Sequence, residues 1–171
     1  EVSVKNQGTG DAGRLEINAD SLRLSQNSSL AAATENGNGG NILLNSRDLQ
    51  LRNNSTITAT AMGSGSGGNI EIDTNTLVAV ENSDITANAQ NSFGGNVTIN
   101  AQGVFGIRER EEITGQSDIT ATSELGTSFS GTVELNTPGI DPSSGVTELP
   151  TDTIDSSNQI ASGCGANTGN S

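Results

Sequence analysis

Two aspartates at equivalent places in a repeated motif come nearest to a chemical site in this chain. Asp84 lies in the segment 83–87 and Asp118 in the segment 117–121, and both segments read SDITA. If these segments are adjacent parallel strands, the two carboxylates face outward about 4.8 Å apart. Such oxygens are the ligands that Ca²⁺ prefers, and a pair of carboxylates about 5–10 Å apart also serves in glycoside hydrolysis.

The rest of the sequence lacks most of the residue types that would complete a catalytic or metal-binding site with these carboxylates. There is no histidine, which excludes Ser-His, Cys-His and His-metal arrangements. Cys164 is the only cysteine and has no partner for an internal disulfide. The glycine-rich stretches 36–40 and 63–68 lack the Lys and the following helix of a phosphate loop. The sequence therefore predicts no catalytic residue, no cofactor and no metal centre, and Asp84 and Asp118 are candidates only for a surface cation.

A repeat along the chain indicates the scaffold that would position these residues. Five times a glycine opens a short alternating segment that ends in Asn or Asp, namely GRLEIN, GNILLN, GNIEID, GNVTIN and GTVELN. These glycines are Gly13, Gly40, Gly68, Gly95 and Gly131, which are 27, 28, 27 and 36 residues apart. A period of this length, with strand patterns and no helical pattern inside it, is typical of a stacked repeat architecture.

Each repeat shows three strand-like pieces at fixed offsets, which the third unit illustrates. Ile70 and Ile72 alternate with polar residues, Leu77 opens a second piece, and Ile85 marks a third. Alternation with a period of two marks a strand that is buried on one face. The sequence predicts an all-β fold, a parallel β-helix with about 27 residues and three short strands per coil, in which equivalent Ile, Leu and Val residues stack into one core.

Polar residues also recur at one register, just past the first strand of each unit. Asn and Asp tolerate left-handed backbone angles, and stacked amides bond along a column, so we expect a structural ladder there. The ladder residues are Asn18, Asn45, Asp73, Asn100 and Asn136.

The fourth unit departs from the pattern by an insertion at 106–113. We interpret it as a solvated loop whose charges pair with each other. A recognition loop is the alternative, because insertions on one face of a solenoid often line a binding surface.

The predicted coils occupy only part of the chain. Residues 1–12 are expected to be the remnant of a preceding coil, 13–137 the β-helix coils, 138–161 an irregular extended strap that caps the last coil, and 162–171 a flexible tail. All three prolines fall in the strap, where they cannot continue a ladder. With neither an initiator Met nor a signal peptide, the chain is expected to be a fragment of a longer protein.

Composition narrows the classes of partner. Seven basic and twenty acidic residues give a net charge of −13, which disfavours nucleic acid and anionic membranes. No apolar run approaches the length that membrane insertion requires. Three Phe and no Trp or Tyr leave little for sugar-stacking platforms or protein-binding hot spots.

An ordered set of segments then resembles a known family. The set comprises the GGNI-type coil openings, NSDITANA at 82–89, GNV at 95–97, QGVFGI at 102–107, SDITATS at 117–123, GTVELNTP at 131–138, DP at 141–142, ELP at 148–150 and IASGC at 160–164. Together these segments resemble the C-terminal region of cyanobacterial filamentous-haemagglutinin-like exoproteins, which carry a haemagglutination-activity domain. The resemblance covers about residues 12–164. It implies a right-handed parallel β-helix and two-partner secretion, in which an outer-membrane β-barrel transporter exports the protein, and it brings no catalytic residues.

Three functional hypotheses follow. The first is a non-catalytic structural and adhesive module on a secreted or cell-surface protein, with surface glycans or other cells as partners. The alternative is a polysaccharide-active lyase or hydrolase, which a cleft holding Asp84 and Asp118 with Arg108 or Arg110 would favour. A threonine row at 58, 86 and 120 is similar to those of ice-binding proteins, but aspartates interrupt the neighbouring row that starts at Thr56.

Overall fold

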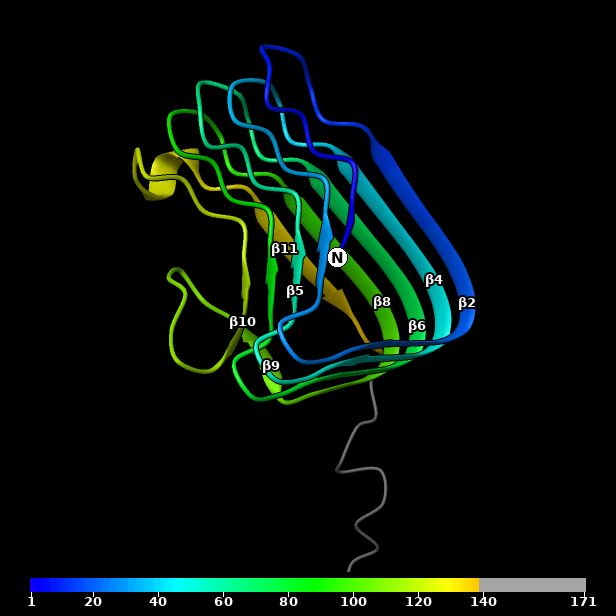
Figure 1. Ribbon diagram of the computed structural model, residues 1–171. Helices are drawn as coiled ribbons and strands as arrows, with labels where there is room; N and C mark the ends of the chain where they lie inside the picture. Colours follow the sequence, from blue (N-terminus) through cyan, green and yellow to red (C-terminus); the bar gives the residue numbers. More distant parts are fainter. Residues whose placement is uncertain (139–171) are drawn as a thin grey trace, which may run out of the picture. The chain divides into compact units, whose positions relative to one another are not determined.

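The glycine-led segments open the long strands of a parallel sheet in the computed structural model, which describes residues 1–138. We call this the long-strand sheet, and its strand order is β11-β8-β6-β4-β2. The bounds are β2 (Arg14–Leu24), β4 (Asn41–Leu51), β6 (Asn69–Ala79), β8 (Asn96–Phe105) and β11 (Thr132–Asn136). The strands lie side by side in chain order, with β2 at one edge and β11 at the other (Figure 1).

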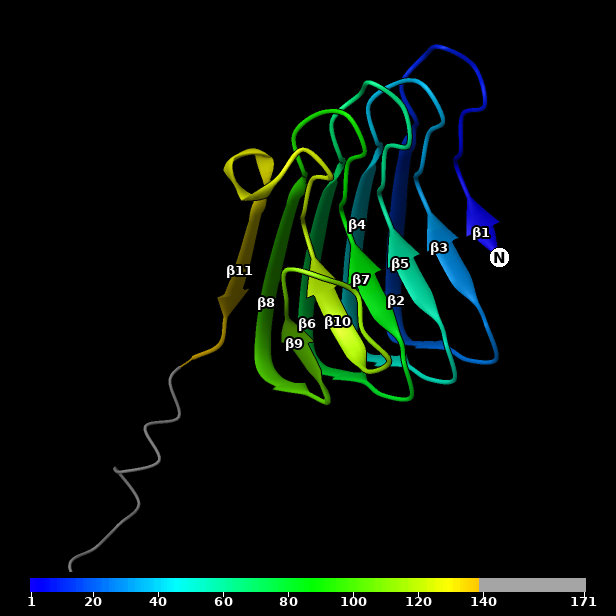
Figure 2. The ribbon, with the colours of Figure 1, turned by 90° about the vertical axis from the view of Figure 1, so that its left-hand side faces the viewer.

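A second sheet of short strands faces the first. This short-strand sheet has the order β1-β3-β5-β7-β10-β9, and Figure 2 shows its members stacked next to one another. The bounds are β1 (Val2–Ser3), β3 (Ser29–Ala31), β5 (Thr56–Thr58), β7 (Asp84–Thr86), β9 (Ile107–Glu109) and β10 (Ser117–Thr120). Isolated parallel bridges at Thr34, Ala61 and Ala89 continue the stacking beyond the short strands.

Every strand pair is parallel, and each coil stacks on its counterpart in the predicted register. Ile42 pairs with Ile70, Ile70 with Val97, and Val97 with Val133. The prediction of an all-β parallel β-helix with coils of about 27 residues is confirmed, and the stack makes about four turns. The only helical element in residues 1–138 is a single 3₁₀ turn, η1 (Thr127–Phe129).

The first and second predicted strands of each coil form one long strand with a bend. Strand pairing runs from Ile42 to Ser46 in β4, skips Arg47, and resumes at Asp48. In a regular strand, residues seven positions apart face opposite sides of the sheet. The bend shifts this alternation by one residue, so Ile42 and Leu49 both face the core. A coil therefore has one long bent strand and one short strand rather than three separate strands.

Left-handed backbone angles lie at a different register from the predicted polar column. The five column residues lie within the long strands, where the backbone is extended. A two-residue left-handed turn instead joins the long strand to the short one, with φ values between 52° and 60°. Its members are Gln26 with Asn27, Asn53 with Asn54, and Glu81 with Asn82. The recurring Asn-Ser at 27–28, 54–55 and 82–83 is the sequence signal for this turn, because Asn tolerates φ > 0 better than most residues.

The glycine pairs are required by the close approach of successive coils. A Cβ atom on Gly68 would overlap the carbonyl oxygen of Gly40 one coil earlier, and one on Gly67 would overlap the carbonyl of Ala87. Gly95 and Gly131 meet the preceding coil in the same way. The repeated glycine thus marks the corner where adjacent coils pack backbone to backbone.

The core is a set of aliphatic columns between the two sheets. Its fully buried side chains include Ile42, Leu44, Leu49, Leu51, Ile57, Ile70, Ile72, Leu77, Ile85, Val97, Ile99 and Ile119. Burying each aliphatic side chain of this size contributes about 1.5–3 kcal/mol before entropy is counted. Apart from Pro138, the strap expected at 138–161, the tail expected at 162–171 and Cys164 lie outside the described residues.

Candidate functional site

The insertion in the fourth coil builds the most irregular surface of the solenoid. After β8 the chain turns at Gly106, whose φ of 79° is left-handed, and forms β9. β9 pairs with β10 on the side away from β7, so it occupies the place where the short strand of a further coil would lie. The chain then returns through a loop at 110–116 to form β10. The order of these two strands in space is therefore the reverse of their order in the chain.

Asp118 on β10 holds this loop in place. Its Oδ1 accepts a hydrogen bond from the Arg110 guanidinium, and its Oδ2 accepts one from the Thr114 backbone N–H at 2.5 Å. The Thr114 hydroxyl donates a further bond to Oδ2 at 2.8 Å. Arg110 also donates to Gln116 Oε1 at 2.6 Å. We call this group of contacts the Asp118 clasp.

The clasp corrects two expectations from the sequence. Asp84 and Asp118 were expected on the surface, but their exposed fractions are 7% and 0%. The reason is that the insertion folds against the outward side of β10. The insertion is exposed at 111–116, as a solvated loop should be, but its charges do not pair with each other, because Arg110 pairs with Asp118 on β10 and not with the neighbouring glutamates.

The two aspartates do come together, as their repeated motif indicated. Asp84 Oδ1 accepts a hydrogen bond of 2.9 Å from the Asp118 backbone N–H. Burial raises the pKa of the Asp84 carboxyl above its ordinary value, because the ionised form loses its hydration. Within residues 1–138, no three carboxylate or thiol side chains gather as metal ligands.

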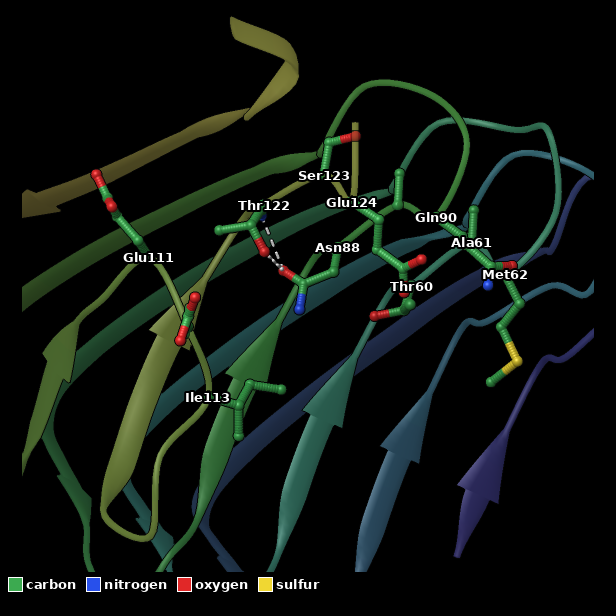
Figure 3. A pocket seen from close by; sticks show the side chains of 12 residues that line it. Thr60, Ala61, Met62, Asn88, Gln90, Glu111, Ile113, Thr122, Ser123 and Glu124 are labelled. Atoms are coloured by element: carbon green, nitrogen blue, oxygen red, sulfur yellow. Dashed lines mark hydrogen bonds between the residues drawn. The ribbon is translucent and has the colours of Figure 1, made fainter. Parts of the chain in front are cut away.

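A hollow lies next to the insertion on the outer surface of the coils. Its volume is about 730 Å³, and Figure 3 shows its lining side chains. Thr60, Asn88 and Thr122, which come from three successive coils, form the floor. Glu111 and Ile113 of the insertion form one side, and Met62, Gln90 and Glu124 lie beyond the floor on the other. Glu112, between Glu111 and Ile113 in the chain, also lines the hollow. Neither Asp84 nor Asp118 lines this hollow.

The floor of the hollow is polar and held by its own hydrogen bonds. Asn88 Oδ1 accepts from the Thr122 backbone N–H at 2.9 Å and from its hydroxyl at 3.3 Å. The amide nitrogen of Asn88 points the other way, toward Ile113 (Figure 3). Thr120, two residues before Thr122 on the same outward side, has the one buried side-chain oxygen without a hydrogen-bond partner in the described part of the chain.

The hollow has an acidic lining. Glu111, Glu112 and Glu124 line it, and no Lys or Arg does. Five of the seven basic side chains form ion pairs elsewhere: Lys5 with Glu1, Arg14 with Glu16, Arg47 with Asp20, Arg52 with Glu81, and Arg110 with Asp118. Arg23 and Arg108 form no ion pair among residues 1–138, and neither lines the hollow. The three glutamates have no ion-pair partner among residues 1–138. The hollow is therefore suited to a ligand with positive charge and hydrogen-bonding groups.

The predicted amide column lies on the outer face of the long-strand sheet. Asn45 donates to Asn18 Oδ1 at 3.0 Å, Asn100 to Asp73 Oδ1 at 2.7 Å, and Asn136 to Asn100 Oδ1 at 3.0 Å. Sequence reasoning missed a second column, in which Asn69 donates to Asn41 and Asn96 to Asn69. The Asn that follows Gly40, Gly68 and Gly95 was its signal.

No helix among residues 1–138 has the length and apolar character needed to span a bilayer. Comparisons with protein-family models, curated proteins and solved structures find no match to this chain.

Proposed function

We propose that this chain is a non-catalytic structural and adhesive module of a secreted surface protein similar to filamentous haemagglutinins. The observation that carries the proposal is the stack of coils, whose aliphatic columns are buried and whose outer faces hold polar side chains bonded from coil to coil. Such a stack presents its outer side chains at fixed spacing, as surface display and attachment require.

The partners and location of the module follow from the resemblance in the sequence. On this proposal the protein is secreted or cell-surface and is exported by two-partner secretion. A region upstream of this chain engages an outer-membrane β-barrel transporter, and the coils then meet surface glycans or other cells. The acidic hollow and the polar outer faces support contact with hydrated, hydroxyl-rich surfaces.

Attachment is tested directly by coating beads with the 171-residue chain and measuring their retention on glycan-coated surfaces and on whole bacterial cells under flow. Beads coated with heat-unfolded chain are the control, because they carry the same charge without the coils. Retention of folded-chain beads above this control is the expected result. Equal retention of the two kinds of bead would overturn the adhesive function.

A polysaccharide-active enzyme is the alternative, and it has one observation in its favour. Arg110 and Asp118 lie next to Asp84, which is part of what the enzyme hypothesis required; the other part is a cleft that holds them. Against it, hydrogen bonds within the protein already engage both Asp118 oxygens, and the hollow lies elsewhere. Incubation with a panel of polysaccharides tests the alternative: release of reducing or unsaturated ends that Asp84→Asn and Asp118→Asn abolish would establish it.

A further inference from the structure

We propose that the hollow beside the insertion binds a chain of amino sugars, of which oligoglucosamine is the simplest representative. The inference rests on the proposed attachment function and assigns it a site and a ligand class. Three features of the hollow support this inference. Its carboxylates have no ion-pair partner within residues 1–138, its floor is polar, and the backbone N–H groups of the floor are already hydrogen-bonded between coils.

The charge of the hollow selects a cationic ligand. Glu111, Glu112 and Glu124 line it without a basic partner among the described residues. Arg110, which directly precedes Glu111 in the chain, pairs with Asp118 and with neither Glu111 nor Glu112. A protonated amine near these carboxylates gains ion pairs and lowers their mutual repulsion. Anionic and neutral glycans gain neither.

The backbone of the floor disfavours a peptide that binds as an added strand. The N–H of Ala61 donates to Asn88, the N–H of Ala89 donates to Thr122, and the N–H of Glu124 donates to Ala89. A peptide that adds to a sheet needs free main-chain groups at an edge. The floor offers no such edge, so its ligand is recognised by side chains.

The spacing of the floor side chains fits a pyranose chain. Thr60, Asn88 and Thr122 come from successive coils, so they recur at about 4.8 Å along the stack. This spacing is close to the length of one sugar unit in an extended chain, whereas side chains on one side of an extended peptide recur at about 6.6 Å. Met62 and Ile113, which are 58% and 54% exposed, offer apolar contacts on opposite sides of Asn88 for the sugar ring faces (Figure 3).

The test is a calorimetric titration of the whole 171-residue chain with oligoglucosamine at about pH 6. We expect binding that weakens with added salt, and weaker or no binding of fully N-acetylated oligomer of the same length. The triple variant Glu111→Gln, Glu112→Gln, Glu124→Gln should bind oligoglucosamine roughly tenfold more weakly. All three residues are exposed loop positions, and circular dichroism verifies that the variant keeps its fold.

A charge-matched control separates the hollow from the net charge of the chain. Glu16→Gln, Glu71→Gln and Glu134→Gln remove three charges from the exposed face of the long-strand sheet and should leave the affinity within twofold. Equal loss in both triple variants, or no binding at all, overturns the proposal. If tetralysine binds as tightly as oligoglucosamine, and the hollow triple variant loses that binding as well, the ligand is a basic peptide and the proposal is overturned. If beads coated with the hollow triple variant are retained as well as beads coated with the parent chain, the attachment function stands and only the assignment of the hollow as its site is overturned.

Discussion

At the scale of single residues, glycine sets how closely the coils pack. Gly68→Ala places a Cβ against the Gly40 carbonyl, and this backbone cannot rotate away as a flexible side chain does. We expect the substitution to lower the free energy of unfolding by more than about 2 kcal/mol. Gly115→Ala is the matched control, because nothing lies within 4 Å of its added Cβ, and it should stay within about 0.5 kcal/mol. Denaturant unfolding compares the two, and equal effects would contradict the close-approach explanation.

The buried Asp84 makes stability depend on pH. Burial raises its pKa, so the folded state favours the protonated carboxyl. Its contribution to stability is therefore fully present below the ordinary value of 3.8 and is lost as the pH rises through the folded-state pKa. Asp84→Asn keeps an oxygen that accepts from the Asp118 N–H but removes the titration. We expect the variant to be more stable than the parent at neutral pH and to lose this advantage near pH 3.8. Thermal unfolding at a series of pH values measures the difference, and a constant difference would contradict the assignment.

At the scale of elements, the clasp decides whether the insertion stays on β10. Asp118→Ala removes the acceptor for Arg110 and for the Thr114 backbone N–H, and loss of one partner from a buried pair costs about 3 kcal/mol. We expect the loop at 110–116 to detach, so that trypsin cuts after Arg108 and Arg110 faster than in the parent. Mass spectrometry of the early fragments locates the cuts. Asp20→Ala is the control, since it breaks the exposed pair with Arg47 and should not change the rate of cleavage at the insertion.

The elements that could be predicted from the sequence are the strands whose residue pattern recurs in every coil. Glycine-led alternation at Ile42, Ile70 and Val97 defined the coil period and the core columns, because burial and strand pairing act on each coil in the same way. The burial of Asp118 had no such local signal. It depends on the insertion forming β9 beyond β10, and pairs such as Ser117 with Ile107 exist only in the folded chain. The acidic hollow was missed for the same reason, because Glu111 and Glu112 of the insertion and Glu124 after β10 line one hollow only in the folded chain.

At the scale of the whole molecule, a stack whose coils contact only their neighbours should open from its edges. β4 and β6 are paired on both sides within the long-strand sheet, and their core-facing aliphatic side chains, such as Ile42, Leu49, Ile70 and Leu77, are fully buried. β2 and β11 each have one paired side among the described residues, and Leu135 on β11 is 40% exposed. Fewer contacts must break to release an edge strand, so its amides should exchange through partial unfolding.

We therefore expect native-state hydrogen exchange to give the highest protection in β4 and β6, with values that fall toward β2 and β11. Amide exchange of the 171-residue chain, followed by NMR at low denaturant, measures this gradient. Equal protection in all long strands would mean that the coils unfold as one unit, which contradicts nearest-neighbour stacking.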